Sequence, residues 1–312
     1  MKPSKSRMSR SFFVVLSLVP FLLMAPRCYG DGTHRWAWGE QTVNNNGGDS
    51  VLNLWRPDPS PGVFSLAQHW YVGGTGKSTQ TVEGGWQVYP GFYNTNDPVL
   101  FIFFTPDNYA SGCYNLTCSG FVQVDNSWVL GGTLTPVSTD GGTQYIIRMQ
   151  WQLYQGNWWL FVQGAGSYIA VGYYPGTLFG SGQMAKNAEI VKYGGETDSD
   201  GSGNAGQMGS GAFASAGWTH AAYQRTIYYI DTTLTSHWTS LGANQPTSTC
   251  YTIDMHNNTS GSWATYFFFG GPKCPNPSQS GGGGIIAVFT LAALLAIWTL
   301  VRLWRRNRTV SA

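Results

Sequence analysis

Residues that favour helices are scarce in this 312-residue chain, which contains only 10% charged residues. Glycine is abundant, with 41 residues, and Phe, Trp and Tyr make up 15% of the sequence. This composition, with no helical period of note, excludes a helical bundle and is typical of strands joined by tight turns. We therefore expect a single all-β domain over residues 31–276, built as two packed antiparallel sheets or as a barrel.

Clusters of basic residues are missing from the central part of the chain. Lys and Arg are concentrated at the two ends, so residues 31–276 contain eight of them against 15 Asp and Glu. The central part therefore has a formal charge of −7, although the whole chain carries +2. Binding to a phosphate backbone requires clusters of Lys and Arg. We expect no nucleic acid partner.

The motifs of metallopeptidases and serine hydrolases are absent. No HExxH or GxSxG string occurs in residues 31–276, and the five histidines have no metal-ligand spacing. Gly73–Ser78 suggests a phosphate loop but has Tyr71 in place of its first glycine. The acidic run from Asp198 has Gly209 where a calcium loop has Glu. We expect no metal and no cofactor.

Both ends of the chain are typical of export and anchoring signals. Residues 1–30 join a basic start to an apolar run and predict a signal peptide cleaved near Gly30–Asp31. A Gly/Ser stalk at 277–284 precedes an apolar segment at 285–304, interpreted as a transmembrane or a clipped sorting segment, and a basic cytoplasmic tail at 305–312. We expect the domain to lie outside the cell, either secreted or anchored by one span.

Four cysteines remain once Cys28 is assigned to the signal peptide, and in an exported domain they predict two disulfides with three possible connectivities. We favour the local pairing of Cys113 with Cys118 and of Cys250 with Cys274. A zinc site fits these spacings poorly. Glycosylation sequons begin at three asparagines that we expect to be exposed in a eukaryotic host: Asn115, Asn257 and Asn258.

Ten strand-like segments recur between turn signals in the central part of the chain. The clearest, Thr143–Leu153, places Tyr145, Ile147, Met149, Trp151 and Leu153 on one face and predicts a half-buried antiparallel strand. The Gly- and Asp-rich stretch Thr197–Gly206 is expected to be a mobile loop. The other nine segments are Gln80–Val88, Val99–Thr105, Gly120–Val124, Trp158–Gln163, Tyr168–Tyr173, Ala188–Tyr193, Gln224–Ile230, Cys250–Met255 and Trp263–Phe269.

With metal and serine chemistry unsupported, carboxylic acid side chains are the remaining candidates for catalysis. Two of the four glutamates, Glu83 and Glu196, each adjoin a Gly-Gly pair in a strand-like segment. Glycine in a strand often marks the close approach of another backbone or of a ligand, and a substrate peptide lying across the sheet would need that clearance. Two carboxylates facing one water hydrolyse an amide when one is the general base and the other the acid, and their repulsion raises one pKa. Spacing alone favours the simpler interpretation of two exposed strand glutamates.

A series of strings in a fixed order resembles the neprosin family of glutamic peptidases. Thr81–Pro90, with the sequence TVEGGWQVYP, is similar to the family's first catalytic-Glu segment, and Gly112–Gln123 resembles its small disulfide loop. The strings that follow in the family's order are Gly156–Leu160, Gly172–Pro175, Tyr193–Glu196, Gln207–Gly211 and Phe268–Pro272. The resemblance extends over residues 65–275.

This resemblance implies a two-sheet antiparallel β-sandwich in which Glu83 and Glu196 are catalytic and face each other across a groove. It also implies the disulfides Cys113–Cys118 and Cys250–Cys274. Plant members of the family cleave after proline at acidic pH, so we expect an extracellular endopeptidase acting on peptide or protein substrates that contain proline. Many members carry a propeptide before the catalytic domain, whereas here that domain is expected to begin almost at the signal cleavage site.

Strand alternation adds two candidate substrate-binding residues. Gln87 lies four positions after Glu83 and Tyr89 follows on the same face, whereas Trp86 points the other way and is expected in the core. We expect a monomer. Two rival functions stay open: a cell-surface carbohydrate- or polymer-binding sandwich without catalysis, and a glycosidase that uses the same carboxylates.

Overall fold

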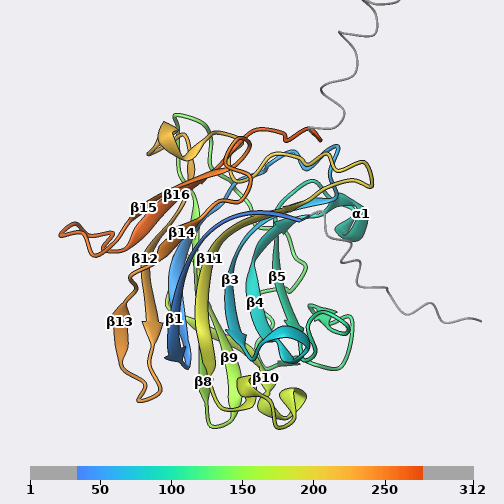
Figure 1. The fold of residues 1–312 in the computed structure, drawn as a ribbon, viewed down its shortest axis with the longest axis vertical. Coiled ribbons are helices and arrows are strands. Elements are labelled where there is room, and N and C mark those ends of the chain that lie inside the picture. Colours follow the sequence, from blue (N-terminus) through green and yellow to red (C-terminus); the bar gives the residue numbers. More distant parts are fainter. Residues whose placement is uncertain (1–33, 277–312) are drawn as a thin grey trace, which may run out of the picture.

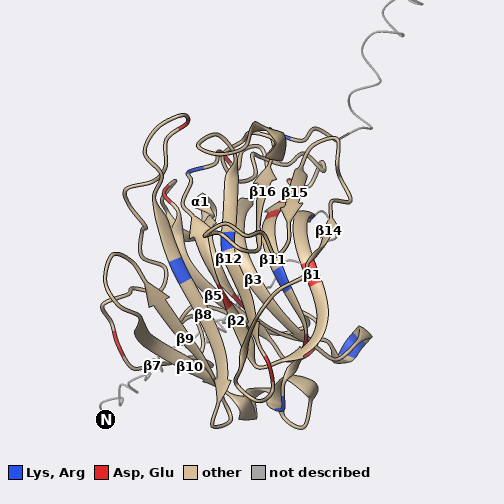
Figure 2. Cartoon of the chain, turned by 90° about the vertical axis from the view of Figure 1, so that its left-hand side faces the viewer, with Lys and Arg blue, Asp and Glu red and all other residues tan. Residues whose placement is uncertain are grey.

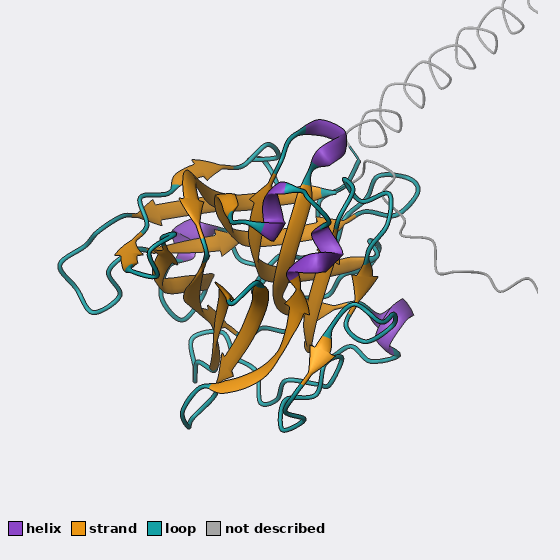
Figure 3. Cartoon of the chain, turned by 90° about the horizontal axis from the view of Figure 1, so that it is seen from below, coloured by secondary structure: helices purple, strands orange, loops and turns teal. Residues whose placement is uncertain are grey.

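The computed structural model describes residues 34–276, which form one domain of two packed antiparallel sheets (Figure 1). The seven-stranded sheet has the order β14-β1-β11-β3-β4-β5-β6. The nine-stranded sheet has the order β15-β16-β12-β2-β8-β9-β10-β7, with β13 paired to β12. Strands and loops account for nearly all of the domain, and its helices are short (Figure 3). The expected all-β, two-sheet sandwich is confirmed.

The elements have the following bounds. The seven-stranded sheet contains β1 (Arg35–Asn45), β3 (Phe64–Gly73), β4 (Gln80–Val88), β5 (Val99–Thr105), β6 (Cys113–Tyr114), β11 (Ala188–Asp198) and β14 (Gly242–Asn244). The nine-stranded sheet contains β2 (Gly47–Asn53), β7 (Val122–Gln123), β8 (Ile146–Tyr154), β9 (Asn157–Gln163), β10 (Ile169–Pro175), β12 (Ala222–Ile230), β13 (Ser236–Trp238), β15 (Thr252–His256) and β16 (Tyr266–Gly270). The helical segments are α1 (Pro90–Tyr93) and the short 3₁₀ turns η1 (Gly76–Ser78), η2 (Gly176–Phe179), η3 (Gln183–Ala185) and η4 (Ala214–Ala216).

Several strands begin and end where the sequence predicts. β4 and β5 match their predicted segments residue for residue. In β8 the alternation is confirmed from Ile147 to Leu153, whose apolar members are buried, while Tyr145 precedes the strand and is exposed. Alternation is visible there because one face of β8 meets the core and the other is partly open.

Three long strands, β1, β2 and β3, were not predicted. Every residue of β2 is buried, and all but one residue of β3 are buried, although both strands contain polar side chains such as Asp49, Gln68 and His69. A strand covered on both faces shows no alternation, and polar residues within it disguise it as a loop. The expected loop at Thr197–Gly206 is wrong at its start, because β11 continues to Asp198 and buries Thr197.

The main core lies between the sheets. Its largest buried side chains include Trp86, Trp151, Trp158 and Tyr71, so the expectation that Trp86 belongs to the core is confirmed. A second apolar group covers the opposite face of the seven-stranded sheet. We call it the outer-face cluster: Phe64, Leu66, Trp70, Phe101 and Phe103.

The cysteines pair as Cys113–Cys118 and Cys250–Cys274, which is the local connectivity. The sequon asparagines differ from one another. Asn257 and Asn258 are exposed, but the expected exposure of Asn115 is wrong. Its side chain is buried, accepts a hydrogen bond from the backbone N–H of Ile102 at 3.0 Å and contributes to the sheet edge.

The predicted signal peptide, stalk, apolar segment and basic tail lie outside the described residues. Within residues 34–276, no helix is both long enough and apolar enough to cross a membrane.

Candidate active site

Glu83 and Glu196 lie on strands β4 and β11, which flank β3 in the seven-stranded sheet (Figure 1). Glu83 is opposite Trp70 on β3 and Glu196 is opposite Leu66, so Gln68 lies between these two positions. Alternate residues of a strand, and residues paired across strands, share a face. The two carboxylates and Gln68 therefore project from the face that carries the outer-face cluster, with one strand between the glutamates.

The carboxyl group of Glu83 is buried in a hydrogen-bonded pocket of its own sheet. Its Oε1 accepts hydrogen bonds from the Thr81 hydroxyl at 2.7 Å and from the Tyr109 hydroxyl at 2.8 Å. Burial and, to a lesser extent, the nearby charge of Glu196 raise the pKa of Glu83 to about 7, against the opposing effect of the hydrogen bonds. Glu83 is therefore a protonated acid throughout the acidic pH range.

Glu196 has different surroundings. Its Oε1 contacts Nδ1 of His34, and its Oε2 accepts a hydrogen bond from Nε2 of Gln68 at 3.3 Å. The other ring nitrogen of His34 lies 3.7 Å from Oδ1 of Asp198, which shares the face of Glu196 on β11. His34 thus lies between the carboxyl groups of Glu196 and Asp198, whereas the hydrogen bonds to Oε1 of Glu83 come from hydroxyl groups.

Gln68 connects the two glutamates. Its amide hydrogen-bonds with Glu196 and also, through a side-chain hydrogen bond, lowers the pKa of Glu83. Sequence reasoning missed this residue because Gln68 belongs to β3, a strand without visible alternation. Tyr109 was also missed. It follows Asn108 in a tight loop where both residues adopt left-handed backbone conformations, with φ of 63° for Tyr109, and this loop brings its hydroxyl to Glu83.

The Gly-Gly pairs beside the glutamates mark the close approach of the protein's own backbone and core side chains. A Cβ on Gly85 would lie 1.9 Å from the carbonyl oxygen of Ala67, and one on Gly194 would lie 2.4 Å from that of Ala37, both in the neighbouring strands. Gly84 and Gly195 face the other sheet, where a Cβ would press on core side chains. The protein's own backbone and core therefore require these glycines.

The structure places both candidate substrate-binding residues near the glutamates. Gln87 lies opposite Leu66, on the face of Glu83, but it is fully buried and accepts a hydrogen bond from the Tyr93 hydroxyl at 3.1 Å. Tyr89 is half-buried just before α1, and its ring centroid lies 5.7 Å from that of Phe64 in the outer-face cluster. Tyr89 is therefore the better placed of the two to touch a substrate.

Over residues 34–276, the structure contains no group of three or more His, Cys, Asp or Glu side chains positioned to hold a metal ion. The arrangement consists instead of two carboxyl groups with contrasting environments, an amide between them and an aromatic surface around them. Its chemical capacity is acid–base catalysis on a bound water.

Two solved structures cover 76% of this chain and 98% of their own: scytalido-glutamic peptidase with a peptide-based transition-state analogue, 8% identical with a TM-score of 0.39, and SCP-B, a member of the eqolisin family of peptidases in a complex with the tripeptide Ala-Ile-His, 8% identical with a TM-score of 0.38. Residues 61–272 match the profile of the neprosin family. Because that match covers more than half of the chain, the chain belongs to the neprosin family.

Proposed function

We propose that this protein is a glutamic endopeptidase that cleaves after proline at acidic pH, with Glu83 and Glu196 as its catalytic pair. Membership of the neprosin family supports the peptidase activity. The observation that carries the proposal for the pair is that two carboxyl groups share one face on either side of Gln68, whose amide hydrogen-bonds to Glu196 and lowers the pKa of Glu83. The two groups also differ in environment enough for the pKa of Glu83 to rise to about 7.

The contrast between the glutamates assigns their roles. Glu196, as a carboxylate, takes a proton from a water molecule whose oxygen attacks the carbonyl carbon of the scissile bond. Glu83, protonated at acidic pH because burial raises its pKa, donates its proton to the carbonyl oxygen or to the leaving nitrogen. If the carbonyl oxygen takes that proton, Glu196 passes the proton from water to the leaving nitrogen, the C–N bond breaks, and Glu83 recovers its proton as the C=O bond re-forms. If the leaving nitrogen takes it, the C–N bond breaks directly, and the proton on Glu196 returns to Glu83 through solvent. Gln68 holds the two groups in place.

The preference for proline is proposed from the surface around the pair. Aromatic side chains of the outer-face cluster, extended by the partly buried Trp36, Trp38, Tyr89 and Tyr114, cover the face from which the glutamates project. Aromatic rings form the walls of most pockets that bind apolar rings and side chains. We also propose that the domain works outside the cell, where its two disulfides persist in oxidising conditions.

The test is cleavage of a quenched fluorescent peptide with a Pro-Xaa bond, measured from about pH 2.5 to about pH 7. We expect activity in the acidic range that Glu83→Gln and Glu196→Gln both abolish. Glu189→Gln is the matched control, because Glu189 lies on the same strand as Glu196 but accepts a hydrogen bond from the backbone of Gly74.

Three outcomes would contradict the proposal or a part of it. If the folded wild-type protein is inert at every pH, the proposed peptidase activity is wrong, and a binding module becomes the function to test. Equal activity towards peptides with and without proline removes only the proposed specificity. Full activity of either glutamate variant removes that glutamate from the catalytic pair.

A further inference from the structure

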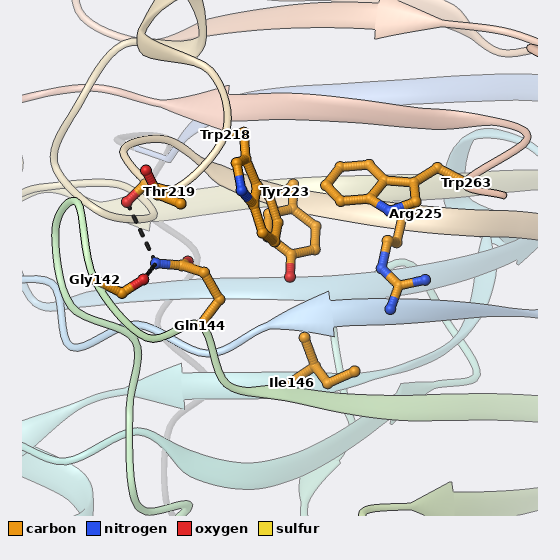
Figure 4. Close-up of a pocket in the computed structure, with 8 residues that line it drawn as sticks. All are labelled: Gly142, Gln144, Ile146, Trp218, Thr219, Tyr223, Arg225 and Trp263. Atoms are coloured by element: carbon orange, nitrogen blue, oxygen red, sulfur yellow. Dashed lines mark hydrogen bonds between the residues drawn. The ribbon is translucent and has the colours of Figure 1, made fainter. Parts of the chain in front are cut away.

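A pocket of about 440 Å³ lies on the nine-stranded sheet, away from the glutamates (Figure 4). It is formed by the loop before β8, the segment before β12, and strands β8 and β12 themselves, with one residue from the segment before β16. We call it the aromatic pocket. The residues that line it are Gly142, Gln144, Ile146, Trp218, Thr219, Tyr223, Arg225 and Trp263.

One wall of the aromatic pocket consists of three packed rings. The centroids of Trp218 and Tyr223 are 5.4 Å apart, those of Trp218 and Trp263 are 5.1 Å apart, and Tyr223 stacks on Trp263 at 4.8 Å. Tyr223 is buried, which fixes the wall, whereas Trp218 is 51% exposed and presents its indole to the pocket. Figure 4 shows these rings side by side above Ile146.

The guanidinium group of Arg225 lies beside this aromatic wall. The guanidinium carbon of Arg225 lies 5.4 Å from the ring centroid of Trp263. Four other basic side chains of the described region form ion pairs with carboxylates: Arg56, Arg148, Lys192 and Lys273. Arg225 forms none with any described residue, and donates instead to the hydroxyl of Thr226 at 3.3 Å. Lys and Arg are few and separated on this domain (Figure 2), and this half-buried guanidinium is the one basic group that lines the aromatic pocket as described.

The opposite rim is already fixed before any ligand binds. Nε2 of Gln144 donates to the carbonyl oxygens of Thr139 at 3.0 Å and Gly142 at 3.1 Å, and it reaches that of Thr219 at 3.3 Å. These bonds tie the loop before β8 to the segment before β12. The pocket is therefore preformed, which reduces the entropy that binding has to overcome.

We propose that the aromatic pocket binds an acidic saccharide, a sugar ring that carries a carboxylate. The C–H face of a pyranose ring packs against the open indole of Trp218, and its carboxylate forms a charge-assisted hydrogen bond with Arg225. The site is separate from the proposed catalytic pair, and it gives the protein a means of holding an acidic glycan while the other sheet acts on a peptide.

The charge and the strand pairing argue against other ligands. A single guanidinium on a domain of formal charge −7 suits one carboxylate and does not suit a polyanion such as nucleic acid. An extended peptide adds to a free strand edge, but β8 is paired with β2 and β9, and β12 is paired with β2 and β16. A proline-rich peptide would use the rings and leave Arg225 without an anion.

The test is calorimetric titration of the whole protein with a trimer of galacturonic acid, with sialyllactose, and with a neutral glucose trimer. We expect at least one acidic saccharide to bind and the neutral trimer to bind much more weakly. Arg225→Gln removes the charge-assisted hydrogen bond and should weaken acidic saccharides about tenfold or more. Trp218→Ala should weaken them by a factor of roughly ten.

The matched control is Trp238→Ala. Trp238 lies on β13 beside the same sheet and is 50% exposed, but it is outside the pocket, so its replacement should leave binding unchanged. Glu83→Gln should also leave binding unchanged, which separates this site from the proposed peptidase function. The proposal is overturned if no acidic saccharide binds, if the neutral trimer binds equally well, if a proline-rich peptide binds in preference, or if folded Arg225→Gln and Trp218→Ala proteins bind like the wild type.

Discussion

The raised pKa of Glu83 predicts a pH-dependent cost to stability that Glu83→Gln should remove. The carboxyl has a pKa of about 7 in the folded protein against 4.5 in a freely solvated chain. The folded state therefore holds this proton more tightly, and the free energy of unfolding falls as pH rises from 4.5 to 7. Each pKa unit corresponds to about 1.4 kcal/mol, so the loss is about 3 kcal/mol and is complete slightly above neutrality.

A glutamine at position 83 has no charge to bury, and its amide oxygen can still accept the hydrogen bonds from Thr81 and Tyr109. Relative to the wild type, we therefore expect Glu83→Gln to gain about 3 kcal/mol of stability between about pH 4 and about pH 8. Urea denaturation of both proteins at several pH values measures this difference. Titrating groups that do not interact with Glu83, such as the buried Asp49, contribute equally to both proteins and cancel in the comparison.

Glu196→Gln refines the same experiment. Burial is the largest cause of the raised pKa of Glu83, and the charge of Glu196 is a lesser one. In a Glu196→Gln background, the effect of replacing Glu83 should therefore shrink but persist. A difference between wild type and Glu83→Gln that does not change with pH would refute the buried, protonated state of Glu83, and with it the role of Glu83 as the acid.

Three further predictions concern the support of the site and of the fold. Gln68→Leu should lower kcat more than it alters KM and move the alkaline limb of the pH profile upward, because the amide of Gln68 lowers the pKa of Glu83; an unchanged profile would contradict this. Trp86→Ala, at a fully buried position, should cost about 3–5 kcal/mol in urea denaturation. Removing the disulfide Cys250–Cys274, which spans 24 residues, should cost about 1 kcal/mol more than removing Cys113–Cys118, which spans 5, and equal losses would argue against a loop-entropy effect.

The strands that the sequence predicts well are those with one dominant signal. β4 and β5 are long apolar or glycine-punctuated runs between turns, and β8 alternates because only one of its faces meets the core. β2 and β3 show no such signal, because both of their faces are covered and both strands contain polar residues. Without β3, no argument from sequence can place Glu83 and Glu196 on either side of one strand.

The sequence by itself determined the class of the fold, the identity of the two candidate glutamates and the local pairing preferred for the cysteines. These features depend on composition, on short strings and on near neighbours in the chain. The tertiary structure alone decided that Gln68 lies between the glutamates, that Tyr109 reaches Glu83, and that burial raises the pKa of Glu83. Strand order and burial depend on contacts between residues far apart in sequence, so no local pattern contains them.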